Sequence, residues 1–180
     1  MKLAALFHDI GKPETYSEDE NGIGHFYGHP SVSCRVCRDI MNRLHADNFT
    51  KDRLCRIVKY HDLVFEKDRR LLKRWMNRFG ADIMLEILEI KKADNFATGN
   101  MEDSLKVKFD EIRQMMEQIL DEQQCFSLRD LAVNGRDVIA AGVEPGPEVG
   151  GVLKRLLSDV IDEKLSNDKD VLMDNILTKN

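Results

Sequence analysis

Apolar residues recur every three or four positions along most of this chain, which is the spacing of one face of an α-helix. The stripes run through Val32, Val36, Ile40 and Leu44; Leu72, Trp75, Met76 and Phe79; Ile83, Met84, Ile87 and Leu88; Leu105, Phe109, Ile112, Met116 and Ile119; and Val149, Val152, Leu153, Leu156 and Val160. A further helix is predicted from about Thr50, as its N-cap, towards His61. No segment is assigned to a β-strand. The pattern predicts an all-α protein, a helical bundle followed by a small helical tail.

Glycines and prolines mark where these helices begin and end. Pro30 stands where a first helical turn tolerates it, and Gly80 closes the stripe that ends at Phe79. The composition changes near residues 123–127, and the turn at 144–147 contains two prolines and a glycine that cannot continue a helix. We therefore expect a larger helical domain over residues 1–125 and a helical segment over residues 126–180.

The size and charge of the chain narrow the class of protein. A chain of 180 residues can bury one core, or one core with a small appendage, and 42% apolar with 33% charged residues is typical of a folded helical protein. No apolar run is long enough to cross a bilayer, which predicts a cytoplasmic protein without membrane contact. The net charge of −5 argues against indiscriminate nucleic-acid binding but allows a local basic face.

The cysteines are interpreted as packing residues. Cys34 and Cys37 form a CxxC pair, but they lie inside an apolar helical repeat and no second pair accompanies them. Zinc or redox chemistry is the alternative.

Histidines and aspartates gather at predicted helix ends and turns of the first domain; they are His8, Asp9, His25, His29, His61 and Asp94. An adjacent His-Asp pair can offer an imidazole and a bridging carboxylate to a metal ion. Lys12 follows Asp9 by three residues, so its ammonium should lie over the same face, an arrangement that suits a phosphate bound to a divalent ion. An isolated histidine is more often a core or capping residue, and that alternative stays open for each of them.

Longer motifs resemble a known family. The run LAALFHDIGKP at residues 3–13, then GHFYGHP at 24–30 and Ser33, resembles the HD metal-site domain of many bacterial CCA-adding tRNA nucleotidyltransferases and poly(A) polymerase-like proteins. The later His61-Asp62 and Asp94 occur in the same order as that family's remaining metal positions. Residues 131–137 (LAVNGRD) and 145–150 (PGPEVG) resemble the helical segment that follows in this family and helps to hold tRNA.

The resemblance implies a set of ligands and a reaction. It implies that His8, Asp9 and Asp94 bind a first divalent ion, Mg²⁺, Mn²⁺ or Ni²⁺, and that His29 and His61 bind a second. His25 is left to a structural role in its turn. In such a site a metal-activated water attacks phosphorus. Asp9 and Lys12 are the expected catalytic residues, with Lys12 neutralising charge on the phosphate oxygens.

The chain also departs from the family pattern. The family's first histidine belongs to a helix that precedes the HD helix, and this sequence starts at the HD helix itself. We therefore expect a site with one imidazole fewer, and an exposed apolar face that a homodimer or another contact covers. The nucleotidyltransferase head is also missing, so the chain is not expected to be a complete nucleotidyltransferase.

A basic stretch between residues 67 and 78 is a candidate RNA-binding face. Arg70, Arg74 and Arg78 repeat every fourth residue opposite the apolar stripe, so tRNA phosphates could lie along them. An ordinary solvated face is the alternative.

Three functions remain after these steps. The first is a metal-dependent phosphohydrolase acting on a phosphate-containing small molecule, either a phosphomonoester or a 2′,3′-cyclic nucleotide. The second is a non-catalytic tRNA-binding fragment or partner of a CCA-adding enzyme. The third is an inert helical scaffold.

Overall fold

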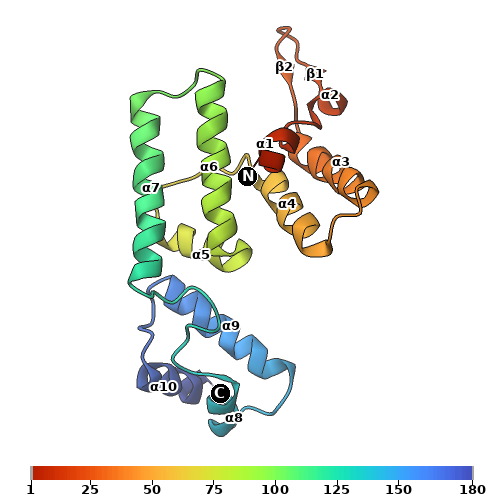
Figure 1. The fold of residues 1–180 in the computed structure, drawn as a ribbon. Coiled ribbons are helices and arrows are strands. Elements are labelled where there is room, and N and C mark those ends of the chain that lie inside the picture. Colours follow the sequence, from red (N-terminus) through yellow and green to blue (C-terminus); the bar gives the residue numbers. More distant parts are fainter. Residues whose placement is uncertain (1, 180) are drawn as a thin grey trace. The chain divides into compact units, whose positions relative to one another are not determined.

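A computed structural model describes residues 2–179, without the side chain of Lys179, and confirms the all-α class. The helices are α1 (Lys2–Phe7), α2 (Lys12–Thr15), α3 (His29–Arg43), α4 (Asn48–Tyr60), α5 (Arg69–Phe79), α6 (Ala81–Ala97), α7 (Asp103–Asp121), α8 (Gly135–Ala140), α9 (Pro147–Ile161) and α10 (Lys169–Lys179) (Figure 1). The chain forms two compact units. Unit 1 comprises Met1–Phe65 and Phe79–Arg113, and unit 2 comprises Glu66–Arg78 and Gln114–Asn180.

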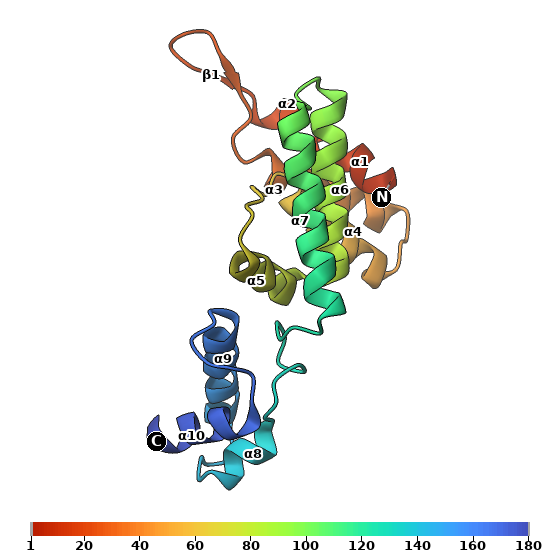
Figure 2. The ribbon, with the colours of Figure 1, turned by 90° about the vertical axis from the view of Figure 1, so that its left-hand side faces the viewer.

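Unit 1 packs α1 to α4, α6 and the first part of α7. Helix α3 packs against α4, and α6 runs antiparallel beside α7 in both ribbon views (Figures 1 and 2). A small antiparallel sheet, β1 (Ser17–Glu18) and β2 (Gly24–His25), pairs Ser17 with His25. This sheet was not predicted, because a strand of only two residues leaves no alternating pattern.

The buried face of α3 differs from the predicted one by one position. Its fully buried side chains are Ser33, Cys37 and Met41, whereas Leu44 of the predicted stripe is 68% exposed. Small side chains allow α3 and α4 to approach closely, and apolar periodicity does not detect a serine in a core. The stripes of α5, α6 and α9 do match the buried positions of those helices.

The N-terminus of α4 also differs from the prediction. The N-cap is Asp47 rather than Thr50: the Asp47 carboxylate accepts hydrogen bonds from the Thr50 backbone NH, at 2.9 Å, and from the Thr50 hydroxyl, at 2.6 Å. Thr50 is thus not the capping residue: its backbone NH is the donor that the capping side chain of Asp47 satisfies.

Cys34 is half-buried, whereas Cys37 of the predicted packing pair and Cys55 are buried. The Cys55 thiol lies 3.8 Å from the Cys34 carbonyl oxygen. Burial, with the neighbouring Cys55, raises the pKa of Cys37 to about 12, so the thiolate that zinc or redox chemistry requires is disfavoured.

Unit 2 has its own core around α8, α9 and α10. Asn134 caps α8, and its side chain and that of Asp137 form a capping box. The core includes Val138, Leu156 and, from α10, Leu172 and Ile176. Helix α10 was not predicted, because its short apolar repeat carries little signal.

The two compact units do not coincide with residues 1–125 and 126–180. Residues 66–78 and 114–125 belong to unit 2, so α5 and the end of α7 form part of that unit. The boundary near residue 125 was predicted to separate the metal-site domain from the RNA-binding segment, and that division stays a prediction. No helix within residues 2–179 is both long and apolar enough to cross a membrane.

Candidate metal centre

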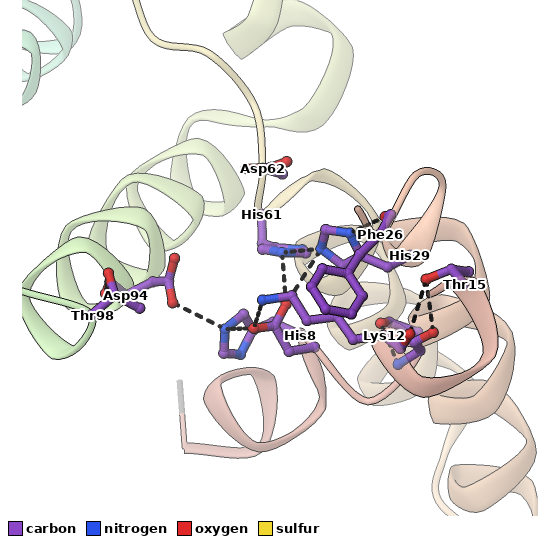
Figure 3. A network of polar contacts seen from close by, with 12 residues as sticks. His8, Lys12, Thr15, Phe26, His29, His61, Asp62, Asp94 and Thr98 are labelled. Carbon is purple, nitrogen blue, oxygen red and sulfur yellow. Dashed lines mark hydrogen bonds and ion pairs between the residues drawn. The ribbon is translucent and has the colours of Figure 1, made fainter. Parts of the chain in front are cut away.

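Three histidines of unit 1 lie close together (Figure 3), and each places its Nε2 within 3.6 Å of a carboxylate oxygen of Asp9. His8 directly follows α1, His29 begins α3 and His61 directly follows α4. In each, Nδ1 lies 2.8 to 2.9 Å from the backbone carbonyl oxygen three residues earlier, those of residues 5, 26 and 58. A carbonyl can only accept, so each Nδ1 carries a proton, and in the neutral imidazole Nε2 then keeps its lone pair. This is the arrangement that orients histidines as metal ligands.

Asp9 joins these histidines into one cluster. Its Oδ2 lies 3.2 Å from Nε2 of His8, and its Oδ1 lies 3.3 Å from Nε2 of His29 and 3.6 Å from Nε2 of His61. Asp94 of α6 completes the cluster, because its Oδ1 lies 3.5 Å from His8 Nε2. The ligand atoms form two groups that share Asp9: His8, Asp9 and Asp94, and Asp9, His29 and His61.

As neutral imidazoles, the three histidines have no proton on Nε2 that could form a hydrogen bond between them. His29 Nε2 and His61 Nε2 are 3.2 Å apart, although the carbonyl contacts make both of them acceptors. His8 Nε2 is buried and makes no hydrogen bond among the described residues. Facing lone pairs repel each other unless a cation or a proton lies between them. The residues therefore fit a divalent cation.

The separations agree with coordination around a cation. Two ligands at about 2.1 Å from one ion are about 3.0 Å apart at octahedral angles and about 3.4 Å apart at tetrahedral angles. The contacts within the cluster span 3.2 to 3.6 Å. Sets of three protein ligands leave positions for water or substrate, which is typical of catalytic rather than structural sites.

Burial also favours ligand behaviour at His61. It lowers the pKa of this imidazole, and the neighbouring His8 and His29 lower it further, against the opposing effects of the Val58 carbonyl and Asp9. The neutral imidazole is the form that binds metal ions. His61 therefore stays ready to bind at neutral pH.

Lys12 lies at the edge of the cluster, as its spacing predicts. Its Nζ is 2.5 Å from Asp9 Oδ2 and 5.6 Å from the centre of the Phe26 ring. An ammonium here can reach an anion that approaches Asp9. Its role in neutralising phosphate charge stays a prediction.

Gly11 allows the turn that carries Asp9 to approach α3. Its backbone NH donates to Ser33 Oγ at 2.9 Å, and an added Cβ would lie 2.6 Å from Ser33 N and 2.8 Å from the His29 carbonyl oxygen. Both of those closest atoms belong to the backbone, which cannot rotate away. Only glycine fits this close approach.

Gly11→Ala is therefore expected to destabilise the protein by about 1 to 3 kcal/mol, because a methyl group must separate the two segments. It should also weaken divalent-metal binding, since the segments carry Asp9 and His29. Chemical denaturation and Mn²⁺ titration measure the two effects. Gly150→Ala is the control: an added Cβ there meets nothing within 4 Å, and alanine favours the interior of α9. Equal stability of the two variants would contradict the prediction.

Other histidine and aspartate side chains lie outside the cluster. His25 Nε2 contacts Asp19 Oδ2 at 3.0 Å and its ring stacks on Tyr27, so it supports the hairpin. Asp62 hydrogen-bonds Lys91 instead and belongs to neither ligand group (Figure 3).

The apolar face expected near the start of the chain is present on unit 1. Leu3 is 46% exposed, Leu6 68% and Phe49 76%. The homodimer expected to cover it stays a prediction.

The basic ridge of α5 is partly neutralised within unit 2. Arg70 Nη2 lies 3.0 Å from Glu163 Oε2, and Arg74 Nη2 lies 2.5 Å from Asp162 Oδ1. The Arg78 guanidinium lies 6.0 Å from the centre of the Trp75 ring. RNA contact by Arg70, Arg74 and Arg78 stays a prediction. To bind a phosphate, Arg70 and Arg74 would have to exchange their carboxylate partners for it.

The backbone carbonyls that orient the histidines were not predicted. A usable signal existed at His61, because the helix predicted from about Thr50 ends near this residue. The last carbonyls of a helix lack partners within it, and a histidine there can donate to one of them.

Fold and site together define an all-α protein with a candidate divalent-metal centre. The family model for tRNA nucleotidyltransferase domain 2 matches residues 23–176, and the chain belongs to this family. The match includes His29, His61 and Asp94 but begins after His8 and Asp9.

Curated relatives carry related names. The chain is 30% identical over 158 residues to the CC-adding tRNA nucleotidyltransferase of Thermus thermophilus, covering 87% of this chain and 35% of the relative. It is 27% identical over 158 residues to the A-adding tRNA nucleotidyltransferase of Deinococcus radiodurans, covering 87% and 36%. A CCA-adding enzyme of Levilactobacillus brevis is 49% identical over 43 residues, 24% of this chain and 11% of the relative. The chain thus spans about a third of the first two relatives. No solved structure matched the chain.

Proposed function

We propose that this chain is a tRNA-binding segment of a protein related to the tRNA nucleotidyltransferases. The observation that carries the proposal is the family match over residues 23–176. Two relatives align with the chain over 158 residues, and both are named as tRNA nucleotidyltransferases. Their names indicate tRNA as the kind of RNA bound. The segment holds the substrate, and adding nucleotides requires groups that the described residues do not provide.

Binding of labelled tRNA to the purified chain, followed by fluorescence anisotropy over a salt series, tests this proposal. Saturable binding that weakens with salt is expected, because contacts to phosphates release counterions. Double-stranded DNA of similar charge is the control and should bind more weakly. Equal affinity for the two nucleic acids, or no binding of tRNA, would overturn the proposal.

We further propose that the cluster in unit 1 is an HD-type metal centre that hydrolyses phosphate esters. The facing Nε2 atoms of His29 and His61, 3.2 Å apart, favour this second function. His8, Asp9 and Asp94 would hold one divalent ion, and His29 and His61 would hold another with Asp9 shared. Such ions lower the pKa of water and polarise a phosphate.

The chain's own residues have separate tasks in this hydrolysis. The backbone carbonyls of residues 5, 26 and 58 hold the imidazoles in orientation. Lys12 would exchange its contact with Asp9 for a substrate oxygen and so bind the phosphate at the open edge. Substrates of this class are phosphomonoesters and 2′,3′-cyclic nucleotides.

Phosphate release from a phosphomonoester, and ring opening of a 2′,3′-cyclic nucleotide, test the hydrolase proposal. The chelator-treated chain should be inactive, and Mg²⁺, Mn²⁺ or Ni²⁺ should restore turnover. Lys12→Met should raise KM more than it lowers kcat if the lysine binds ground-state phosphate. No turnover with any of the three metals would leave a tRNA-binding segment without hydrolase activity.

A further inference from the structure

Unit 2 contains a buried lysine that the proposals above do not use. Lys73 of α5 is only 7% exposed, although lysine is among the residues least often buried without a partner. It lines a cavity of about 490 Å³. The other walls come from the segment after α7, including Gln123 and Gln124, and from the segment between α9 and α10, including Ser166 and Asn167.

No group in the described part of the chain neutralises this lysine. Lys73 makes no hydrogen bond and no ion pair within residues 2–179. Glu163 also lines the cavity, but its carboxylate is bound by Arg70. The Asp130 carboxylate accepts from the Ser127 backbone NH at 2.8 Å. The side chain of Lys73 is buried but its ammonium nitrogen stays accessible, so an anion that enters the cavity could pair with it without displacing a protein partner.

An unused acceptor accompanies the cation. Gln124 lines the same cavity, and its Oε1 is buried without a hydrogen-bond partner. Its Nε2 donates to Glu122 Oε2 at 2.5 Å, which fixes which end of the amide is the oxygen. The cavity therefore offers a positive charge and a carbonyl acceptor. A ligand that fits has an anionic oxygen and a nearby hydroxyl.

We propose that this cavity binds a ribose-phosphate unit of RNA, with the Lys73 ammonium on a phosphate oxygen and the Gln124 amide oxygen accepting from the 2′-hydroxyl. The 2′-hydroxyl is the group by which proteins distinguish RNA from DNA. Cavities of 300 to 1,000 Å³ are typical of ligand sites. The inference rests on the proposed tRNA binding, and it places one of the tRNA contacts in the cavity beside Lys73.

Lys73→Met tests the phosphate contact, because methionine keeps the length of the side chain and removes its charge. Affinity for tRNA is expected to fall roughly tenfold or more, as for loss of a charge-assisted hydrogen bond. Lys154→Met is the matched control: Lys154 is an exposed lysine of α9 in the same unit. It should change affinity less than about twofold. If both variants lost tRNA affinity equally, Lys73 would contribute only general electrostatic attraction, and the proposed binding site would be wrong.

Gln124→Met tests the hydroxyl contact. The ratio of affinities for an RNA strand and for the DNA strand of the same sequence should narrow in this variant, because only the RNA loses a partner. An unchanged ratio would overturn the role of Gln124.

A stability measurement separates binding from folding. Lys73→Met should leave the Tm unchanged or raise it, since the native lysine is unpaired, whereas a large decrease would show that Lys73 is a structural residue. Binding of adenosine 5′-monophosphate tests whether the phosphate in the cavity comes from a free nucleotide or from RNA. If it binds through Lys73 while tRNA affinity is unchanged in Lys73→Met, the cavity serves a free nucleotide and the RNA assignment is wrong. If wild-type chain fails to bind tRNA at all, the proposed function fails first.

Discussion

Asp9→Asn is expected to reduce divalent-metal affinity by more than about 100-fold and to abolish metal-dependent hydrolysis. Asp9 is the one residue shared by both ligand groups, and its two oxygens face different histidines. Asparagine keeps the shape but removes the negative charge that balances a cation. Changes to residues that only orient ligands typically cost 10- to 100-fold, so loss of a shared ligand should cost more.

Asp62→Asn is the matched control for this prediction. Asp62 belongs to the other His-Asp pair, but its carboxylate pairs with Lys91. Burial raises its pKa, yet the hydrogen bond and charge of Lys91 outweigh this and leave the pKa below its usual value. Metal binding should therefore survive in Asp62→Asn. Isothermal titration with Mn²⁺ and elemental analysis of the dialysed proteins measure both variants. Comparable metal content in Asp9→Asn and wild type would show that these residues do not form a metal centre.

Helical periodicity was sufficient to predict the main helices, because their buried faces consist of large apolar side chains. Met84, Ile87 and Leu88 of α6 lie fully inside, as their spacing indicates. The prediction failed where burial depends on close approach rather than on apolar surface. Ser33 is fully buried on α3 because it accepts from Gly11 NH, a contact between residues 22 positions apart. A local pattern contains no information on such a pair.

The residues of the candidate metal centre could be named from the resemblance, but their geometry could not. The resemblance gave the ligand positions, and the structure brings His8, Asp9, His29, His61 and Asp94 together. Orientation depends on carbonyl groups, which every residue has and no sequence pattern distinguishes. The same limit applies to Lys73: in sequence it is one of several basic residues of α5, and only tertiary packing shows that it is buried.

Unit 2 should also depend on its own core, which makes Leu156 a position of large effect. This side chain of α9 is fully buried among residues of α8, α9 and α10. Leu156→Ala is expected to reduce the free energy of unfolding by about 2 to 5 kcal/mol, from lost apolar burial and the cavity left behind. Leu177→Ala on α10 is the control: its side chain is 59% exposed, and the cost should stay below about 0.5 kcal/mol.

Hydrogen exchange shows where the stability is lost. If each unit is held by its own core, Leu156→Ala should speed exchange in α8, α9 and α10 while α3 and α4 keep their protection. The candidate metal ligands all belong to unit 1, so Mn²⁺ affinity should be retained under conditions where unit 2 has lost protection. Uniform loss of protection along the chain, with metal binding lost in parallel, would mean that the chain unfolds as a single cooperative body.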